Sequence, residues 1–183
     1  MTQTTQTSTW LPTDYEAPKG NSNYLRLEKG ENRFRILSSP IIGWEDWDNK
    51  NPLRFRMNEK PEKSIDPKKP IKHFWAFIVF NYFKNEIQIM EITQKSIQSS
   101  IETLAKDKDW GNPFGFDIKI LREGDGMDTE YTVNPVPHKP VTEEVLAAFR
   151  LKPCFLDALY NGEDPFDMVK SDNKRSPLND LQL

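Results

Sequence analysis

The sequence predicts a mainly β protein: a five-stranded barrel with one helix between its third and fourth strands, short C-terminal helices, and flexible ends. Three observations predict it. Runs of alternating apolar residues are separated by turn residues, one stretch has helical spacing, and both ends are polar without periodicity. The 183 residues suit one domain with extensions, and their hydrophobic share of 36% is low enough that part of the chain should lie outside a core.

Three strands are expected in the first half of the chain. The first covers residues 32–47, with a bend or bulge at Ser38-Ser39-Pro40, and a short strand at 24–27 precedes it. The second, 71–82, is rich in aromatic and β-branched residues and apolar on both faces, which is unusual in a sheet with one face in water. Only one face can be the core unless something covers the other. Residues 86–92 follow as the third strand.

Helical spacing replaces alternation after residue 92. An N-cap is expected at Thr93, and residues 110–113 should stop the helix. The apolar stripe consists of Ile97, Ile101, Leu104 and Ala105. Residues 116–120 then alternate as the fourth strand, and residues 131–133 return as the fifth across a Gly-rich turn.

The chain divides by composition into four parts. We expect a flexible arm at 1–23, a barrel domain at 24–140, a helical extension at 141–160 and a disordered, mildly acidic tail at 161–183. Thr142 should open the first helix of the extension.

Five strands in this order, with a helix between the third and fourth, have the element order of an oligonucleotide/oligosaccharide-binding (OB) barrel. In that fold the ligand face is built by strands two and three and by the loops that join strands one to two and four to five. Here these are residues 71–92, the loop at 48–70 and the loop at 123–129. The last of these is acidic, so we do not expect it to hold phosphates.

The net charge of −3 conceals an uneven distribution along the chain. Residues 50–72 hold eight Lys and Arg against three acidic residues, whereas residues 73–183 have a net charge of −6. A basic loop alone is more often just a solvated loop. Beside aromatic strands, however, it supplies both ingredients of a surface for single-stranded nucleic acid, which are cations for phosphates and rings for bases.

The expected binding residues therefore combine rings and cations, with no catalytic residue and no cofactor. Trp44, Trp47, Trp75 and Phe77 are expected to stack on bases, and Phe55 and His73 adjoin them. The expected phosphate contacts are Arg26, Arg33, Arg35, Arg54 and Arg56. The alternative for the rings is burial under the helix or in an oligomer. Four other phenylalanines are expected in the core: Phe34, Phe74, Phe80 and Phe116.

Several classes of protein are disfavoured. A lone Cys154 and two histidines allow no internal disulfide and no Cys/His zinc site. The carboxylates of Glu45, Asp46 and Asp48 could hold magnesium in a nuclease, but a polar turn is the simpler interpretation. The longest apolar run has seven residues against the ~18 needed to span a bilayer, so we expect a soluble, unsecreted protein.

Five runs of sequence resemble bacteriophage and prophage single-stranded DNA-binding proteins. They are YLRLEKGENRFRIL at 24–37, PIIGW at 40–44, HFWA at 73–76, FDIKILREG at 116–124 and DTEY at 128–131. The resemblance covers roughly residues 24–140. It implies an OB barrel that coats single-stranded DNA in replication, recombination or repair in the cytoplasm of the bacterial host, without reading base edges.

The resemblance also implies protein partners. Such proteins commonly recruit replication or recombination proteins through an acidic C-terminal tail. The tail at 161–183 departs from this pattern with a net charge of only −2, so the helices at 142–160 are an equally good docking element. A different hypothesis is an OB barrel for protein interaction, a homo-oligomeric structural or adaptor component that buries the second apolar face of residues 71–82 against another subunit.

Overall fold

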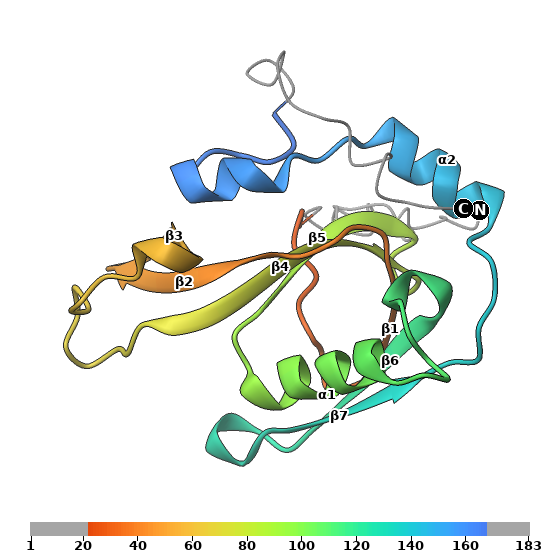
Figure 1. Cartoon of the computed structure of the whole chain (residues 1–183), viewed down its shortest axis with the longest axis horizontal. Helices are drawn as coiled ribbons and strands as arrows, with labels where there is room; N and C mark the ends of the chain where they lie inside the picture. The colour runs from red at the N-terminus through yellow and green to blue at the C-terminus, as the bar shows by residue number, and fades with distance from the viewer. Residues whose placement is uncertain (1–21, 168–183) are drawn as a thin grey trace, which may run out of the picture.

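The computed structural model describes residues 22–167, which form one seven-stranded sheet and two α-helices (Figure 1). Most of the expected arm and tail, 1–21 and 168–183, lies outside the described residues. The strands are β1 (Gly30–Ile36), β2 (Ile41–Asp48), β3 (Asn51–Arg56), β4 (Lys72–Asn81), β5 (Glu86–Ile92), β6 (Asp117–Glu123) and β7 (Glu130–Pro135). The helices are α1 (Lys95–Lys106) and α2 (Glu143–Leu151), and a 3₁₀ helix covers Leu156–Asn161.

β1 and β2 together form the expected long bent strand. Both pair with β4, and the chain between them bends at residues 37–40. There the Ile78 N–H donates to the Ser38 hydroxyl oxygen at 2.9 Å, in place of a regular ladder bond. The predicted break at Ser38-Ser39-Pro40 is therefore confirmed, and it lets the first half of the strand also pair with β6 and the second half with β3.

The number of strands differs from the prediction. β3 forms from residues that were expected to be loop, and the expected strand at 24–27 is reduced to a parallel bridge between Tyr24 and Ile89. All the ladders are antiparallel, in the order β3-β2-β4-β1-β6-β7, with β5 on the remaining edge of β4. Because no ladder joins β5 to β7 within residues 22–167, the described sheet is open and the five-stranded barrel is not confirmed.

The helix boundaries follow local signals in one case and not in the other. The Thr142 hydroxyl accepts from the Val145 N–H at 3.4 Å, so Thr142 caps α2 as expected. Thr93 does not cap α1. The N-cap is Gln94, which makes no capping bond with its side chain, and α1 ends at Lys106, before the stop signal expected at 110–113.

The two apolar faces of β4 lie in two different cores. On the first face Phe77 and Val79 pack with Phe34 and Phe116 beneath α1. On the second face Phe74 and Phe80 pack against residues 141–166, which we call the C-terminal segment. The other members of this core include Ala76, Ile78, Val145, Phe149, Cys154 and Leu159. We call these the α1 side and the α2 side of the sheet. Figure 1 shows α1 on one side and α2 with the 3₁₀ helix on the other. All four phenylalanines expected in the core are buried.

A buried ion pair holds the linker between β7 and α2 against the sheet. Arg35 is only 1% exposed, and its Nε donates to Asp117 at 2.5 Å while its Nη1 donates to the carbonyls of Phe114 and Lys139 at 3.1 Å. Burial alone would raise the pKa of Asp117, but hydrogen bonds from Arg33 and Arg35 outweigh it and hold that pKa below its ordinary value. The expectation that Arg35 contacts phosphates is therefore wrong, because its guanidinium lies inside the fold.

The covering role of α2 predicts that its buried face contributes to the stability of the whole sheet. Phe149→Ala should destabilise the protein by about 3–5 kcal/mol, since it removes a large side chain that is 2% exposed and leaves a cavity. Leu151→Ala is the matched control, because Leu151 is on the same helix and 86% exposed. Urea unfolding followed by circular dichroism measures both. Equal stability of the two variants would contradict the packing of α2 on the sheet.

Candidate nucleic-acid interface

Three aromatic side chains form a row on the α1 side of β2 and β4, at the end of the sheet that α1 leaves open. Trp44 lies opposite His73 in the ladder, with ring centroids 5.3 Å apart. Trp75 follows two residues along β4 and donates its indole N–H to His73 Nε2 at 3.1 Å. We call Trp44, His73 and Trp75 the aromatic row. Each of them is half-buried, so part of each ring faces solvent.

The hydrogen bonds fix the orientation of the central imidazole. Because His73 Nε2 accepts from Trp75, the ring proton belongs on Nδ1, which lies 2.7 Å from the Gly43 carbonyl oxygen and donates to it. The absence of a side chain at Gly43 is also required, since a Cβ there would come within 2.0 Å of the Phe55 carbonyl oxygen. The aromatic row is thus held by backbone contacts on two strands.

The basic loop at 57–71 is fastened to this side of the sheet by one buried carboxylate. Asp46 accepts from the Ser64 hydroxyl at 2.7 Å and from the Ile65 N–H at 2.9 Å. Burial alone would raise the pKa of Asp46, but these bonds and one from the Trp47 N–H hold it below its ordinary value. Asp46 therefore anchors the loop beside the aromatic row.

The loop places positive charge directly on the row. The Lys60 ammonium lies 4.1 Å from the centre of the Trp44 ring, and the Trp44 indole N–H donates to the Met57 carbonyl at 3.2 Å. The other exposed lysines of the loop are Lys63, Lys68 and Lys69. The expected combination of rings and cations is thus brought together here, with lysines rather than arginines as the cations.

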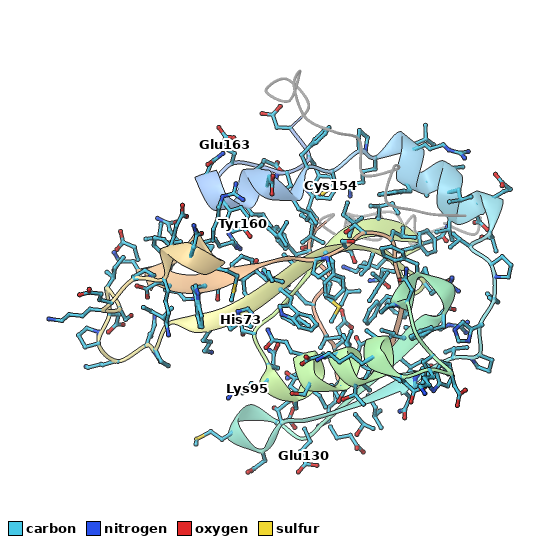
Figure 2. The ribbon with its side chains drawn as sticks, viewed as in Figure 1. His73, Lys95, Glu130, Cys154, Tyr160 and Glu163 are labelled. Atoms are coloured by element: carbon cyan, nitrogen blue, oxygen red, sulfur yellow. The ribbon has the colours of Figure 1, made fainter. Side chains whose placement is uncertain are left out.

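Three of the expected binding residues, on β2 and β3, face the α2 side of the sheet. Trp47 alternates with Trp44 and points toward the α2 side, where its indole N–H donates to Glu45 at 3.0 Å. The side chain of Arg54 is 7% exposed and donates to Glu91 at 2.7 Å. The guanidinium of Arg56 lies 4.3 Å from the centre of the Tyr160 ring. Figure 2 shows Tyr160 on the side of the C-terminal segment. As a phosphate contact, Arg54 is an incorrect expectation, because it is buried in an ion pair.

The remaining expected residues have separate positions. Phe77 is 2% exposed within the α1-side core, so the expectation that it stacks on bases is wrong. Phe55 is half-buried and lies opposite Trp44 in the β2–β3 ladder, next to the row. Arg26 is exposed, and Arg33 pairs with Asp117 and lies over the Tyr82 ring. Both are on the first part of the chain, outside the aromatic row.

Ile42 was missed by the sequence reasoning. Ile42 lies opposite Trp75 and is 40% exposed, which extends the apolar surface of the row. Its position two residues before Trp44 was the available signal. The triplet Glu45, Asp46 and Asp48 does not converge on one point: Asp46 binds the loop and Glu45 faces Trp47. Within residues 22–167 no group of three or more His, Cys, Asp or Glu side chains is arranged to hold a metal ion.

Two carboxylates, Glu45 and Glu91, are neighbours on the α2 side of the sheet. Burial, together with the neighbouring carboxylate of Glu91, raises the pKa of Glu45 to about 7, although the Trp47 N–H and Arg54 act in the opposite direction. Glu45 Oε2 is buried and has no hydrogen-bond partner. Folding therefore makes Glu45 easier to protonate than it is in the unfolded chain.

The Asp46 anchor predicts the accessibility of the basic loop. Asp46→Ala should speed tryptic cleavage after Lys63 and Lys68 by roughly tenfold or more, because one hydrogen bond to a charged group contributes about 1.5–3 kcal/mol. Asp48→Ala is the control, since Asp48 is an exposed carboxylate two residues away. Cleavage sites are assigned by mass spectrometry. Unchanged cleavage in Asp46→Ala would show that the loop is held by other contacts.

The raised pKa of Glu45 predicts a pH dependence of stability. A carboxyl group whose pKa is about 7 when folded and about 4.5 when unfolded contributes most below pH 4.5, and this contribution is lost as the pH rises toward 7. Relative to Glu45→Gln, the wild-type protein should therefore become less stable over this range. Urea unfolding of both proteins at several pH values measures the difference. A difference that does not change with pH would contradict the assignment.

Comparison with known proteins finds one informative relative. The chain is 28% identical over 150 residues to a protein of Escherichia phage T5 named "Probable ssDNA-binding protein". The alignment covers 64% of this chain and 58% of that protein, so the chain matches little more than half of the relative's length. No family model matches the chain, and no solved structure matches it. The resemblance to phage single-stranded DNA-binding proteins, expected from the sequence, is confirmed by this relative.

Proposed function

We propose that this protein binds single-stranded DNA on the α1 side of β2 and β4, without reading the sequence of bases. The observation that carries the proposal is the aromatic row beside an anchored loop of exposed lysines. Base stacking on an aromatic ring contributes about 1–3 kcal/mol per base and tolerates every base, because each has a flat π face. The name of the T5 relative supports the same class of ligand.

Each part of the surface has a distinct task in this proposal. Trp44 and Trp75 stack on bases, while His73, held between them, sets their spacing. Lys60 covers the Trp44 ring in the protein without DNA. When a base takes that place, the Lys60 ammonium is released toward the neighbouring phosphate. The other lysines of the loop follow the backbone by charge alone, so the contacts carry no sequence information.

The biological setting we propose is phage DNA replication, recombination or repair in the host cell, with a coating role and no catalysis. Proteins of those processes would be its partners, and docking through the C-terminal segment stays part of the proposal. No helix within residues 22–167 is long and apolar enough to cross a membrane. The alternative of an OB-like adaptor rested on the second apolar face of β4. In the described residues that face is covered by α2 and the 3₁₀ helix of the same chain, so it is not free to bind another subunit.

Substitution of Trp44 tests the proposal most simply. Trp44→Ala should weaken binding of a labelled oligo-dT by roughly tenfold, the loss of one stacked base, measured by fluorescence anisotropy. Trp47→Ala removes an equally large ring from the other side of the same strand and should bind as the wild type does. Circular dichroism confirms that both variants are folded. Equal loss of affinity in both variants would contradict the assignment of the α1 side.

The salt dependence of the same titration tests the role of the lysines. If Lys60, Lys63, Lys68 and Lys69 each neutralise one phosphate, log K should fall with log salt with a slope of about −2.8, at ~0.7 per contact with single strands. Replacing Lys68 and Lys69 by Ala should reduce the slope by about 1.4. Replacing Lys108 and Lys139, two exposed lysines outside this surface, is the control. Binding that does not depend on salt would exclude the proposed phosphate contacts.

A further inference from the structure

An apolar pocket continues the aromatic row beyond Trp75. It has a volume of about 290 Å³ and lies between the bend at 38–40, the C-terminal end of α1 and residues 112–114. Trp75 forms part of its wall and is also the last ring of the row. A single DNA strand that follows the aromatic row along β4 therefore reaches this pocket next.

The lining of the pocket suits a flat ring system. Trp75, Phe77 and Phe114 supply aromatic walls, and Ala105 and Pro113 supply small apolar surfaces. The volume is at the lower end of the ~300–1,000 Å³ typical of small-molecule sites, which limits the occupant to a group about as large as one base. The pocket is thus neither a groove for a chain nor a site for a larger ligand.

Five lining residues of the pocket are polar: Ser38 is buried, whereas Ser39, Glu102, Lys106 and Asn112 are exposed. Ser39 and Asn112 are exposed lining residues that can face the polar edge of a base. Lys106, also a lining residue, pairs with Glu102 one helical turn earlier, and both side chains are largely exposed. An exposed pair of this kind is weak, so a phosphate can compete with Glu102 for the ammonium.

We infer that this pocket receives one unstacked nucleobase of the bound strand, with Lys106 against the phosphate of that nucleotide. The inference rests on the proposed function and extends it, because it adds a defined base-sized site to a surface of stacked rings. A base is favoured over an apolar side chain of a protein partner by the shared wall of Trp75 and by the cation at the rim. Both features place the pocket on the path of a polyanion whose bases are stacked on the aromatic row.

The test blocks the pocket after the protein has folded. Ala105→Cys places a thiol in the lining, and N-phenylmaleimide attached to it fills the space. The native Cys154 should not react, because it is 1% exposed and burial raises the pKa of its thiol to about 12. Ala147→Cys, at an exposed position on α2, is the matched control for labelling. Affinity for an oligo-dT of about 16 nucleotides is measured before and after labelling.

The outcomes separate the pocket from the proposed function as a whole. Labelling of Ala105→Cys should weaken binding roughly 5- to 150-fold, the range for loss of one stacked base, while labelled Ala147→Cys binds as it did before. If labelled Ala105→Cys keeps full affinity for oligo-dT, the pocket does not hold a base, although the proposed function stands. If the unlabelled wild-type protein does not bind oligo-dT at all, the proposed function fails first.

Discussion

The structure depends on one strand that is apolar on both faces. β4 cannot leave either face in water, so the chain must supply two covers, α1 on one side and the C-terminal segment on the other. Ile97 and Ile101 place α1 on the half of β4 that carries Phe77 and Val79. The other half, with His73 and Trp75, is only partly covered: Trp75 packs against the edge of the same core, and both side chains stay half-buried beside β2. The same constraint that builds the core therefore exposes the aromatic row.

Two of the arginines expected to bind phosphates are buried in ion pairs, whereas the lysines of the basic loop are exposed. Arg35 and Arg54 are buried with Asp117 and Glu91, where they connect the linker and the hairpin to the sheet. Loss of one partner from such a pair leaves an uncompensated buried charge, so these arginines are structural. The cations beside the aromatic row are lysines of the loop at 57–71. Lysine acts on phosphates as a mobile point charge, which suits a surface that tolerates any sequence.

Local patterns predicted those features that depend on neighbouring residues. The bend at Ser38-Ser39-Pro40, the extent of β5 and the cap at Thr142 each follow from a few adjacent side chains. β3 was missed because Pro52 and the surrounding charges indicated a loop, although Leu53 and Phe55 do alternate with arginines. Proline is tolerated in β3 because β3 is an edge strand. The burial of Arg35 and Phe77 could not be predicted from alternation, because alternation defines two faces and not which segment, far along the chain, will cover each.

The central claim is that single-stranded DNA lies on the α1 side of β2 and β4, along the aromatic row, and photochemical crosslinking tests it most directly. An oligo-dT with iodouracil at single positions is irradiated in complex with the full-length protein, and the crosslinked peptides are sequenced by mass spectrometry. We expect crosslinks at Trp44, His73 and Trp75. Crosslinks confined to Trp47, Tyr24 and Tyr160, on the opposite side of the sheet, would contradict the account.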